Sequence, residues 1–272
     1  MRYVIDHDLH IHTHLSSCSG HPQQTTDNIL RYALDNGLKT ICVTDHYWDE
    51  TIPGASGWYA PQNTAHIRQS LPLPQAEGVR FLFGCETELS RDCVLGVSPA
   101  RFDGLDFVIV PTTHLHMTDF TVTGKETAEE RAALWVRRLD ALLAMDLPFR
   151  KIGIAHPVCG LIAPTRAMFL ETLRLLPEAE LERLFAKAAS LGCGVELNAD
   201  DFGFAEEETE TVLRPFVIAK RCGCKFYCGS DAHAPEDFTH AIQRFERAVD
   251  LLGLTEEDKY PVLHGSLWDS GK

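Results

Sequence analysis

The sequence of 272 residues lacks several features that define other classes of protein. No apolar run reaches the roughly 18 residues of a membrane-spanning helix, and Met1–Asp8 does not have the pattern of a signal peptide. No internal repeat, block of like charge or Gly/Ser linker divides the chain. We therefore expect a cytoplasmic protein with no membrane partner, folded as one domain over residues 1–272. The sequence makes no prediction about the oligomeric state.

Basic residues and paired cysteines are also scarce. The 25 Lys and Arg stand against 39 Asp and Glu, which gives a net charge of −14. This charge repels nucleic acids and anionic membranes, but it does not exclude small anionic substrates, because bound metal ions can invert the local field. The closest of the nine cysteines, Cys222, Cys224 and Cys228, lack the paired spacing of a zinc ribbon, so we interpret the cysteines as reduced thiols.

The chain does contain an alternation of short apolar segments and amphipathic segments. Seven β-strands are expected at Tyr3–His12, Thr40–Thr44, Val79–Cys85, Asp106–Pro111, Lys151–Ala155, Cys193–Leu197 and Lys225–Cys228. Helices are expected between and after them at Thr26–Asn36, Glu126–Met145, Glu178–Leu191, Val212–Cys222 and Glu236–Leu252. Strands that alternate with helices favour parallel pairing, so we expect a single α/β domain resembling a barrel. The segment Tyr47–Gly78 is expected to form a long loop over one rim.

The ends of the expected strands carry most of the potential metal ligands. These are His10, His12, His46, Glu86, His114, His156, Asp231 and His233. In β/α barrels the active site is built at the C-terminal ends of the strands. His10 and His12 are two residues apart on a strand and share a face, and Asp231 and His233 repeat this spacing. Imidazole and carboxylate together suit zinc, iron and manganese, so the pattern predicts a metal centre.

Other residues have weaker patterns. We interpret His7, His14, His66, His240 and His264 as hydrogen-bonded surface or capping residues. His116 shares strand parity with His114, and Glu88 shares it with Glu86, so each stays open as an alternative ligand. Cys85 has the opposite parity and is given no catalytic role.

These motifs, in this order, resemble the polymerase and histidinol phosphatase (PHP) family, and most of all its stand-alone histidinol-phosphate phosphatases. The matching motifs are Asp8-Leu9-His10-Ile11-His12-Thr13, Thr44-Asp45-His46, Gly84-Cys85-Glu86, His114, His156-Pro157 and Gly229-Ser230-Asp231-Ala232-His233. The resemblance covers nearly the whole chain. It implies a distorted seven-stranded (β/α)7 barrel that holds two or three divalent metal ions (Zn, Mn or Fe).

The resemblance also implies how the ligands divide among the metals. One metal would be held by His10, His12, Glu86 and Asp231. Glu86 would bridge to a second metal, completed by His114 and His156. A third would be held by His46 and His233 with one further ligand, where the family commonly has an Asp or His shortly after His-Thr. Here that segment contains no Asp, so His21 is our choice and Cys18 the reserve.

The implied activity is hydrolysis of a small phosphomonoester, with L-histidinol phosphate, cleaved to L-histidinol and phosphate in histidine biosynthesis, as the leading substrate. A metal-bound hydroxide would attack phosphorus, and the metals would neutralise charge on the phosphoryl oxygens. Asp231 and His233 are the catalytic candidates, as proton acceptor or relay. Asp8 or Asp45 could orient a ligating imidazole. Arg166, Arg91 and Lys125 are candidates for contact with the substrate phosphate.

Three other functions stay open. A sister activity of the family is cleavage of nucleotide or oligonucleotide phosphoesters. An amidohydrolase-type C–N hydrolase also has His-x-His on its first strand, but eight strands and often a bridging lysine are typical of that class. A catalytically silent metal-binding module would be expected to have lost ligands, whereas this chain retains almost all of them.

Overall fold

The computed structural model describes residues 1–261, and His264 and the rest of 262–272 lie outside the described residues. The strands are β1 (His7–Ile11), β2 (Thr40–Val43), β3 (Arg80–Phe83), β4 (Cys85–Glu86), β5 (Val108–Pro111), β6 (Ile152–Ala155), β7 (Gly194–Asn198) and β8 (Lys225–Gly229). They form two sheets, in the orders β1-β2-β3 and β4-β5-β6-β7-β8, and every ladder is parallel. The expected α/β class with parallel pairing is therefore confirmed.

The predicted number of strands is wrong, because the third expected strand, Val79–Cys85, divides at Gly84 into β3 and β4. β3 pairs with β2, whereas β4 pairs with β5 in the other sheet. A Cβ atom at Gly84 would collide with the carbonyl oxygen of Phe107 and the sulfur of Cys42. This close approach is invisible in the apolar pattern that runs through the segment. The eighth strand arises by division of one expected strand and has no helix before it. It therefore does not complete the eight β/α units that are typical of amidohydrolases.

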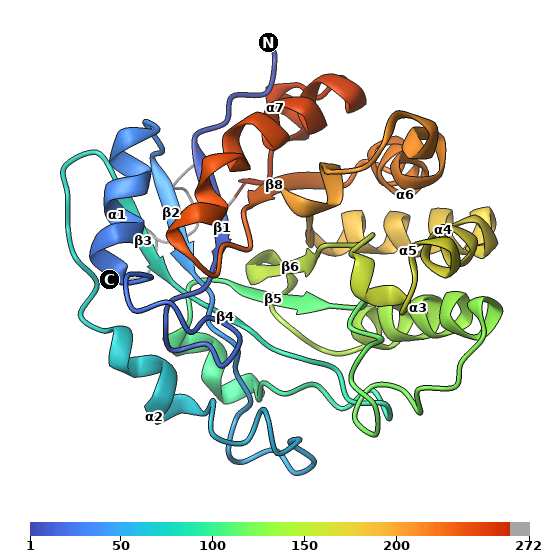
Figure 1. Ribbon diagram of the computed structural model, residues 1–272, viewed down its shortest axis with the longest axis horizontal. Helices are drawn as coiled ribbons and strands as arrows, with labels where there is room; N and C mark the ends of the chain where they lie inside the picture. Colours follow the sequence, from blue (N-terminus) through green and yellow to red (C-terminus); the bar gives the residue numbers. More distant parts are fainter. Residues whose placement is uncertain (262–272) are drawn as a thin grey trace.

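Two isolated parallel bridges link the sheets. Ile11 bridges to Ala232 just after β8, and His46 bridges to Glu86 on β4. The first and last strands thus lie side by side, as the positions of their polar ends require. Figure 1 shows the helices around the outside of the strands.

The helices follow from caps that can be read in the sequence. They are α1 (Thr26–Asp35), α2 (Thr64–Ile67), α3 (Ala128–Leu143), α4 (Arg166–Leu175), α5 (Glu178–Leu191), α6 (Thr209–Arg221) and α7 (Ala241–Leu252). Thr127 and Glu130 form a capping box at the start of α3, and left-handed Gly192 and Gly253 end α5 and α7. α4 was not expected, and neither was the short α2, which lies within the segment expected to be a loop. Within residues 1–261, no helix has both the length and the apolar character needed to cross a membrane.

The segment between residues 47 and 78 is packed against the domain. Trp48 and Tyr59 are buried and form a cluster with Phe120. Asp49 accepts hydrogen bonds from Ser98 and Arg101. Burial opposes ionisation of Asp49, but these donors outweigh it and hold its pKa below the usual range. The segment is therefore packed into the domain through buried aromatic side chains and hydrogen bonds.

Candidate metal centre

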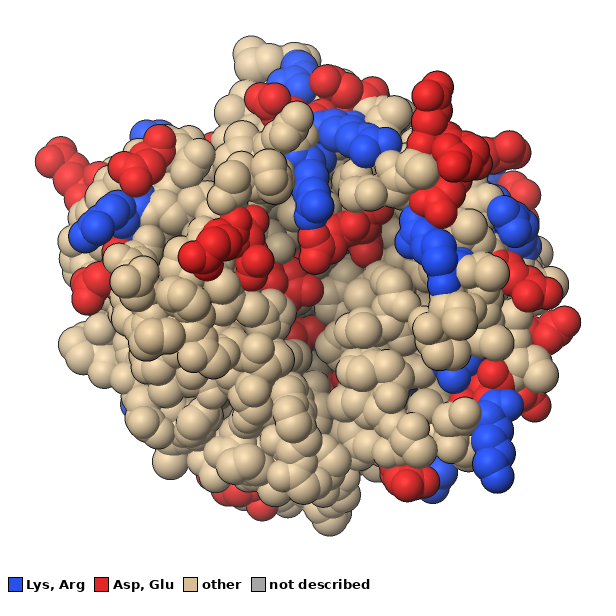
Figure 2. Space-filling view, in the orientation of Figure 1, with Lys and Arg blue, Asp and Glu red and all other residues tan. Residues whose placement is uncertain are grey.

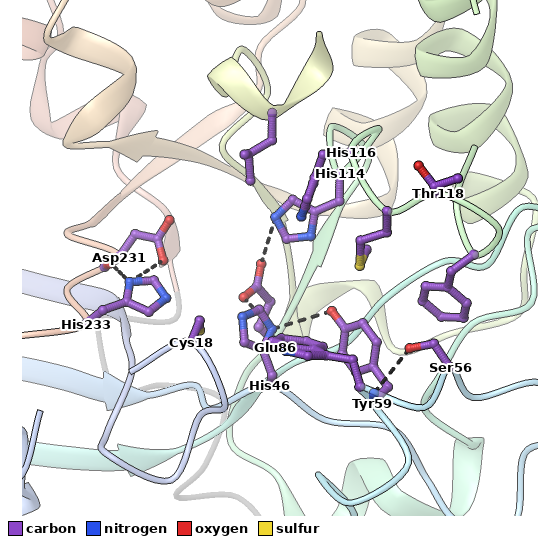
Figure 3. Close-up of a pocket in the computed structure, with 14 residues that line it drawn as sticks. Cys18, His46, Ser56, Tyr59, Glu86, His114, His116, Thr118, Asp231 and His233 are labelled. Carbon is purple, nitrogen blue, oxygen red and sulfur yellow. Dashed lines mark hydrogen bonds and ion pairs between the residues drawn. The ribbon is translucent and has the colours of Figure 1, made fainter. Parts of the chain in front are cut away.

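The polar strand ends meet in one buried place (Figure 3). His10 lies on β1 and His12 just after it, Glu86 ends β4, and His114, His156, Asp231 and His233 follow β5, β6 and β8. Four groups have ligand atoms within 4.8 Å of one another: His12, Cys18, His46 and His233; His10, His12 and Asp231; His10, His156 and Glu196; and Glu86, His114 and His156. Eight of the nine predicted metal ligands are thus brought together, and His21 is not among them.

The group of His10, His12 and Asp231 is the tightest. The two Nε2 atoms are 3.0 Å apart, and Asp231 Oδ1 lies 3.1 Å from each of them. The Nδ1 atom of His10 lies 2.7 Å from Glu196 Oε1. A carboxylate only accepts hydrogen bonds, so this Nδ1 carries a proton, and in the neutral ring the Nε2 atom is the nitrogen that can bind a metal.

The tautomer of His12 follows from a longer chain of hydrogen bonds. The Ser16 hydroxyl donates to Asp45 Oδ1 at 2.7 Å, and it lies 2.9 Å from His12 Nδ1. A hydroxyl has one proton to give, so Ser16 must accept from His12 Nδ1. When both rings are neutral, as metal ligation requires, two imidazole nitrogens and one carboxylate oxygen offer lone pairs to one point. A divalent cation fits this donor set, because it satisfies all three lone pairs at once.

Glu86 lies at the centre of the cluster and is 1% exposed. Its Oε2 is 3.0 Å from His46 Nδ1 and 3.3 Å from His12 Nε2, and its Oε1 is 3.1 Å from His156 Nε2. Burial opposes ionisation of Glu86, but His46 and His10 outweigh it and hold its pKa well below the usual range. The two oxygens of this carboxylate thus face different imidazoles, as a bridging ligand requires.

Glu88 lies behind His114 and is in none of the four groups. Its Oε2 is 2.8 Å from His114 Nδ1, and its Oε1 accepts from Arg138 Nη2 at 2.6 Å. This contact fixes the His114 tautomer and turns its Nε2 toward Glu86. The sequence left Glu88 open as a ligand, and the structure places it as the partner of one. His116 packs edge-on against His114 and lies outside the groups.

The group that contains His46 and His233 is completed by Cys18 and not by His21. Cys18 is on the segment between β1 and α1, and its neighbour Ser19 donates a hydrogen bond of 2.5 Å to the carbonyl oxygen of His233. The rings of His12 and His233 stack with centroids 4.3 Å apart. His21 Nδ1 instead accepts from the backbone of Gln23.

Sequence reasoning missed the role of Glu196, which is fully buried on β7. Besides holding His10, its Oε2 accepts from the backbone nitrogen of His156 at 2.5 Å. Its carboxylate occupies the space where a Cβ of Gly229 would lie. A charged residue inside an apolar strand was the available signal. Asp8 contacts no imidazole nitrogen within residues 1–261; it accepts from the backbone nitrogens of His10 and Ser230.

The cluster opens into a cavity of about 530 Å³. Its lining residues are Cys18, His46, Ser56, Trp58, Tyr59, Glu86, His114, His116, Met117, Thr118, Phe120, Leu161, Asp231 and His233. Among residues 1–261, no Lys or Arg lines it. Burial, and then His114, lower the pKa of His116 to about 4, so its ring is neutral near pH 7. Figure 2 shows acidic side chains in the hollow of this face and along its upper edge, with Lys and Arg side chains beside them.

The three predicted phosphate-binding cations lie outside this cavity. Arg166 lines a second cavity of about 660 Å³, which shares Leu161 and Asp231 with the first. Its guanidinium is paired with Glu208. Arg91 and Lys125 are exposed and line neither of the two cavities.

Comparisons with known proteins give a consistent result. No family model matches the chain. A probable phosphatase of Vibrio vulnificus (strain YJ016) is 35% identical over 267 residues, which cover 94% of this chain and 87% of the relative. A probable phosphatase of Thermoanaerobacter sp. (strain X514) is 28% identical over 264 residues, covering 94% and 89% of the two chains.

Among solved structures, histidinol phosphate phosphatase from Lactococcus lactis, in complex with zinc, L-histidinol and phosphate, superposes with a TM-score of 0.61 at 18% identity. The match covers 91% of this chain and 92% of that one, and it shows a shared fold. The similarity to the Vibrio protein spans nearly the whole chain at an identity that marks common descent. The chain therefore belongs to the family of these probable phosphatases, which confirms the enzyme class expected from the sequence.

Proposed function

We propose that the chain is a metal-dependent phosphatase that hydrolyses a small phosphomonoester. The observation that carries this proposal is the convergence of His10 Nε2, His12 Nε2 and Asp231 Oδ1, which lie 3.0–3.1 Å apart in a buried site. Burial opposes charge on both rings, but Asp231 and the neighbouring carboxylates outweigh it and raise the pKa of His10 and of His12. The site therefore favours positive charge, which a divalent cation supplies in place of protons on the two rings. Membership of a phosphatase family supports the reaction class.

The ligands are assigned from the groups above. His10, His12 and Asp231 would hold one metal, and Glu86 would bridge it to a second, held also by His114 and His156. His46 and His233 would hold a third. There we replace His21 by Cys18, because the thiol and not the imidazole lies among the other ligand atoms. Divalent metals supply Lewis acidity toward the phosphoryl oxygens and lower the pKa of water. Zinc, manganese and iron all remain compatible with the imidazoles and carboxylates.

The chain's own residues would position the reaction. Glu196, Glu88 and Asp45 (through Ser16) hold the imidazoles in the tautomers that leave their ligating nitrogens free. Asp231 and His233 line the cavity and stay the candidates for proton transfer. Arg166 is the best placed of the three cations, because its cavity adjoins the cluster. The two bridges between the sheets support a distorted closed barrel as the frame of the site.

L-Histidinol phosphate is the substrate that we propose to test first. The motifs resemble the histidinol-phosphate phosphatases, and the Lactococcus protein of the same fold was solved with L-histidinol and phosphate. A place in histidine biosynthesis and a cytoplasmic location belong to the same proposal. A nucleotide bearing further phosphates is disfavoured, since no Lys or Arg among residues 1–261 lines the main cavity.

The test is phosphate release from L-histidinol phosphate by protein loaded with Zn²⁺ or Mn²⁺. A kcat/KM of about 10⁴ M⁻¹s⁻¹ or more lies within the usual enzyme range and would support the assignment. The Asp231→Ala variant is the control and should be inactive. If metal-loaded protein releases phosphate from nucleotides but not from L-histidinol phosphate, the substrate assignment changes to a nucleotide and the phosphatase assignment stands. Protein that hydrolyses no phosphomonoester at all would refute the proposal.

A further inference from the structure

One wall of the main cavity is aromatic and comes from two separate segments. Trp58 and Tyr59 belong to the segment between β2 and β3, and Met117 and Phe120 to the segment after β5. The rings of Trp58 and Tyr59 meet edge-on with centroids 4.8 Å apart, and those of Tyr59 and Phe120 lie 5.5 Å apart. Trp58 is 38% exposed although it is part of this cluster, so part of its ring is free to contact a ligand.

This wall begins directly at the candidate metal centre. The ring of Trp58 meets the ring of His46 at 70° with centroids 4.9 Å apart, and Tyr59 lies on the same imidazole at 5.8 Å. A phosphoryl group at the metal ligands would therefore lie close to the aromatic wall, so that a ring near the ester oxygen could reach Trp58.

The charges around the cavity disfavour a leaving group that carries a second anion. No Lys or Arg of residues 1–261 lines it, so a second phosphate or a carboxylate would find neither as a counterion. Beyond the ligand candidates, the lining consists of aromatic and apolar side chains, the hydroxyls of Ser56 and Thr118, and the imidazole of His116. The wall itself thus suits a flat and largely apolar ring.

We propose that Trp58, together with Met117 and Phe120, binds an aromatic ring in the leaving group, and that the substrates are phosphomonoesters with a ring close to the ester oxygen. In the reaction, water adds to phosphorus, the ester P–O bond breaks, and the ring-bearing alcohol leaves with a proton beside inorganic phosphate. The imidazole of L-histidinol phosphate falls within this class, as do arylalkyl phosphates. This inference rests on the proposed function, because it assumes that phosphorus lies at the metal ligands.

Binding of two nonhydrolysable ligands tests the ring site independently of turnover. 2-Phenylethylphosphonate and ethylphosphonate carry the same phosphonate and differ by the ring. Isothermal titration of each into the metal-loaded full chain should give a dissociation constant roughly tenfold lower for the phenyl compound, since ring packing on an aromatic wall adds both buried area and ring contact. Equal dissociation constants would overturn the proposal.

Variants then assign the preference to the wall. Trp58→Ala should bring the ratio of the two dissociation constants close to one, and Trp58→Phe, which keeps a ring, should retain most of it. Val217→Ala, at an exposed apolar position on α6, is the control and should leave the ratio unchanged. A ratio that survives in Trp58→Ala would refute the role of Trp58.

Turnover of the matching esters separates this inference from the proposed function. If 2-phenylethyl phosphate and ethyl phosphate are both hydrolysed with equal kcat/KM, the phosphatase stands and the ring site fails. If neither is hydrolysed but the phenyl phosphonate still binds more tightly through Trp58, the ring site stands and the proposed reaction fails.

Discussion

Replacement of Glu196 by Gln should weaken metal binding without a large change in shape. The carboxylate of Glu196 is fully buried, and its two shortest hydrogen bonds join it to His10 Nδ1 at 2.7 Å and to the backbone nitrogen of His156 at 2.5 Å, with a longer one from Asn198 Nδ2 at 3.4 Å. A Gln amide has the same volume but only one oxygen, so it can accept one of the two shortest bonds and must turn its NH₂ group toward the other donor. One hydrogen bond to a charged group is therefore lost, which costs about 1.5–3 kcal/mol.

The consequence should appear in the affinity for metal. Removing a hydrogen-bond partner from a metal-ligating histidine typically lowers metal affinity or activity by about 10–100-fold. That range corresponds to about 1.4–2.8 kcal/mol, which agrees with the loss of one charged hydrogen bond. Titration of apo-protein with Zn²⁺ against a competing chelator measures the affinity, and phosphate release measures activity.

The control for this variant is Glu207→Gln, which removes the same charge at an exposed position. It should bind metal as the unmodified protein does. An affinity of Glu196→Gln within twofold of the unmodified protein would refute the assignment of Glu196 as the residue that positions His10.

Three further outcomes follow from the cluster. Asp231→Asn should lower phosphate release by about 100-fold or more and reduce the bound metal measured by elemental analysis, because a neutral amide replaces a ligand carboxylate; normal turnover would contradict the assignment. Protein loaded with Co²⁺ should show a thiolate-to-cobalt absorption band that Cys18→Ala abolishes and His21→Ala retains. Absence of this band in the loaded unmodified protein, together with weaker cobalt binding in His21→Ala, would restore His21 as the ligand. Burial raises the pKa of Asp201 to about 8, above its value of about 3.9 in an unfolded chain. The folded metal-free protein therefore holds this proton more tightly than the unfolded chain does, and it loses stability as the pH rises from about 4 to about 8. Asp201→Asn should remove that part of the loss, and urea unfolding at pH 6 and pH 9 should show a smaller decrease for the variant than for the unmodified protein.

The positions of the ligand candidates could be read from the sequence because they depend on periodicity. His10 and His12 share a face since side chains alternate along a strand, and Glu86 and His114 follow apolar segments whose ends meet in parallel pairing. These rules need no knowledge of which strands are neighbours. The same reasoning predicted the α/β class.

Features that depend on contacts between distant segments could not be read in this way. The division at Gly84 arises from the carbonyl of Phe107, more than twenty residues away in the sequence. Glu196 and Glu88 act on imidazoles from other strands, so only the register between strands shows their roles. The choice between Cys18 and His21 depends on how one irregular segment folds back, which the hydrogen bond from Ser19 to His233 determines.

The origin of the cavity walls has a consequence for how this protein can diversify. The ligand candidates are attached mainly to strand ends and are held from behind, as Arg138 of α3 holds Glu88 and through it His114. Trp58 and Met117, in contrast, lie on segments that connect strands and take no part in holding an imidazole nitrogen. Mutations at these two positions can therefore change which molecule is accepted while the chemistry is conserved. Related chains could share one reaction and differ in substrate through a few residues of these two segments.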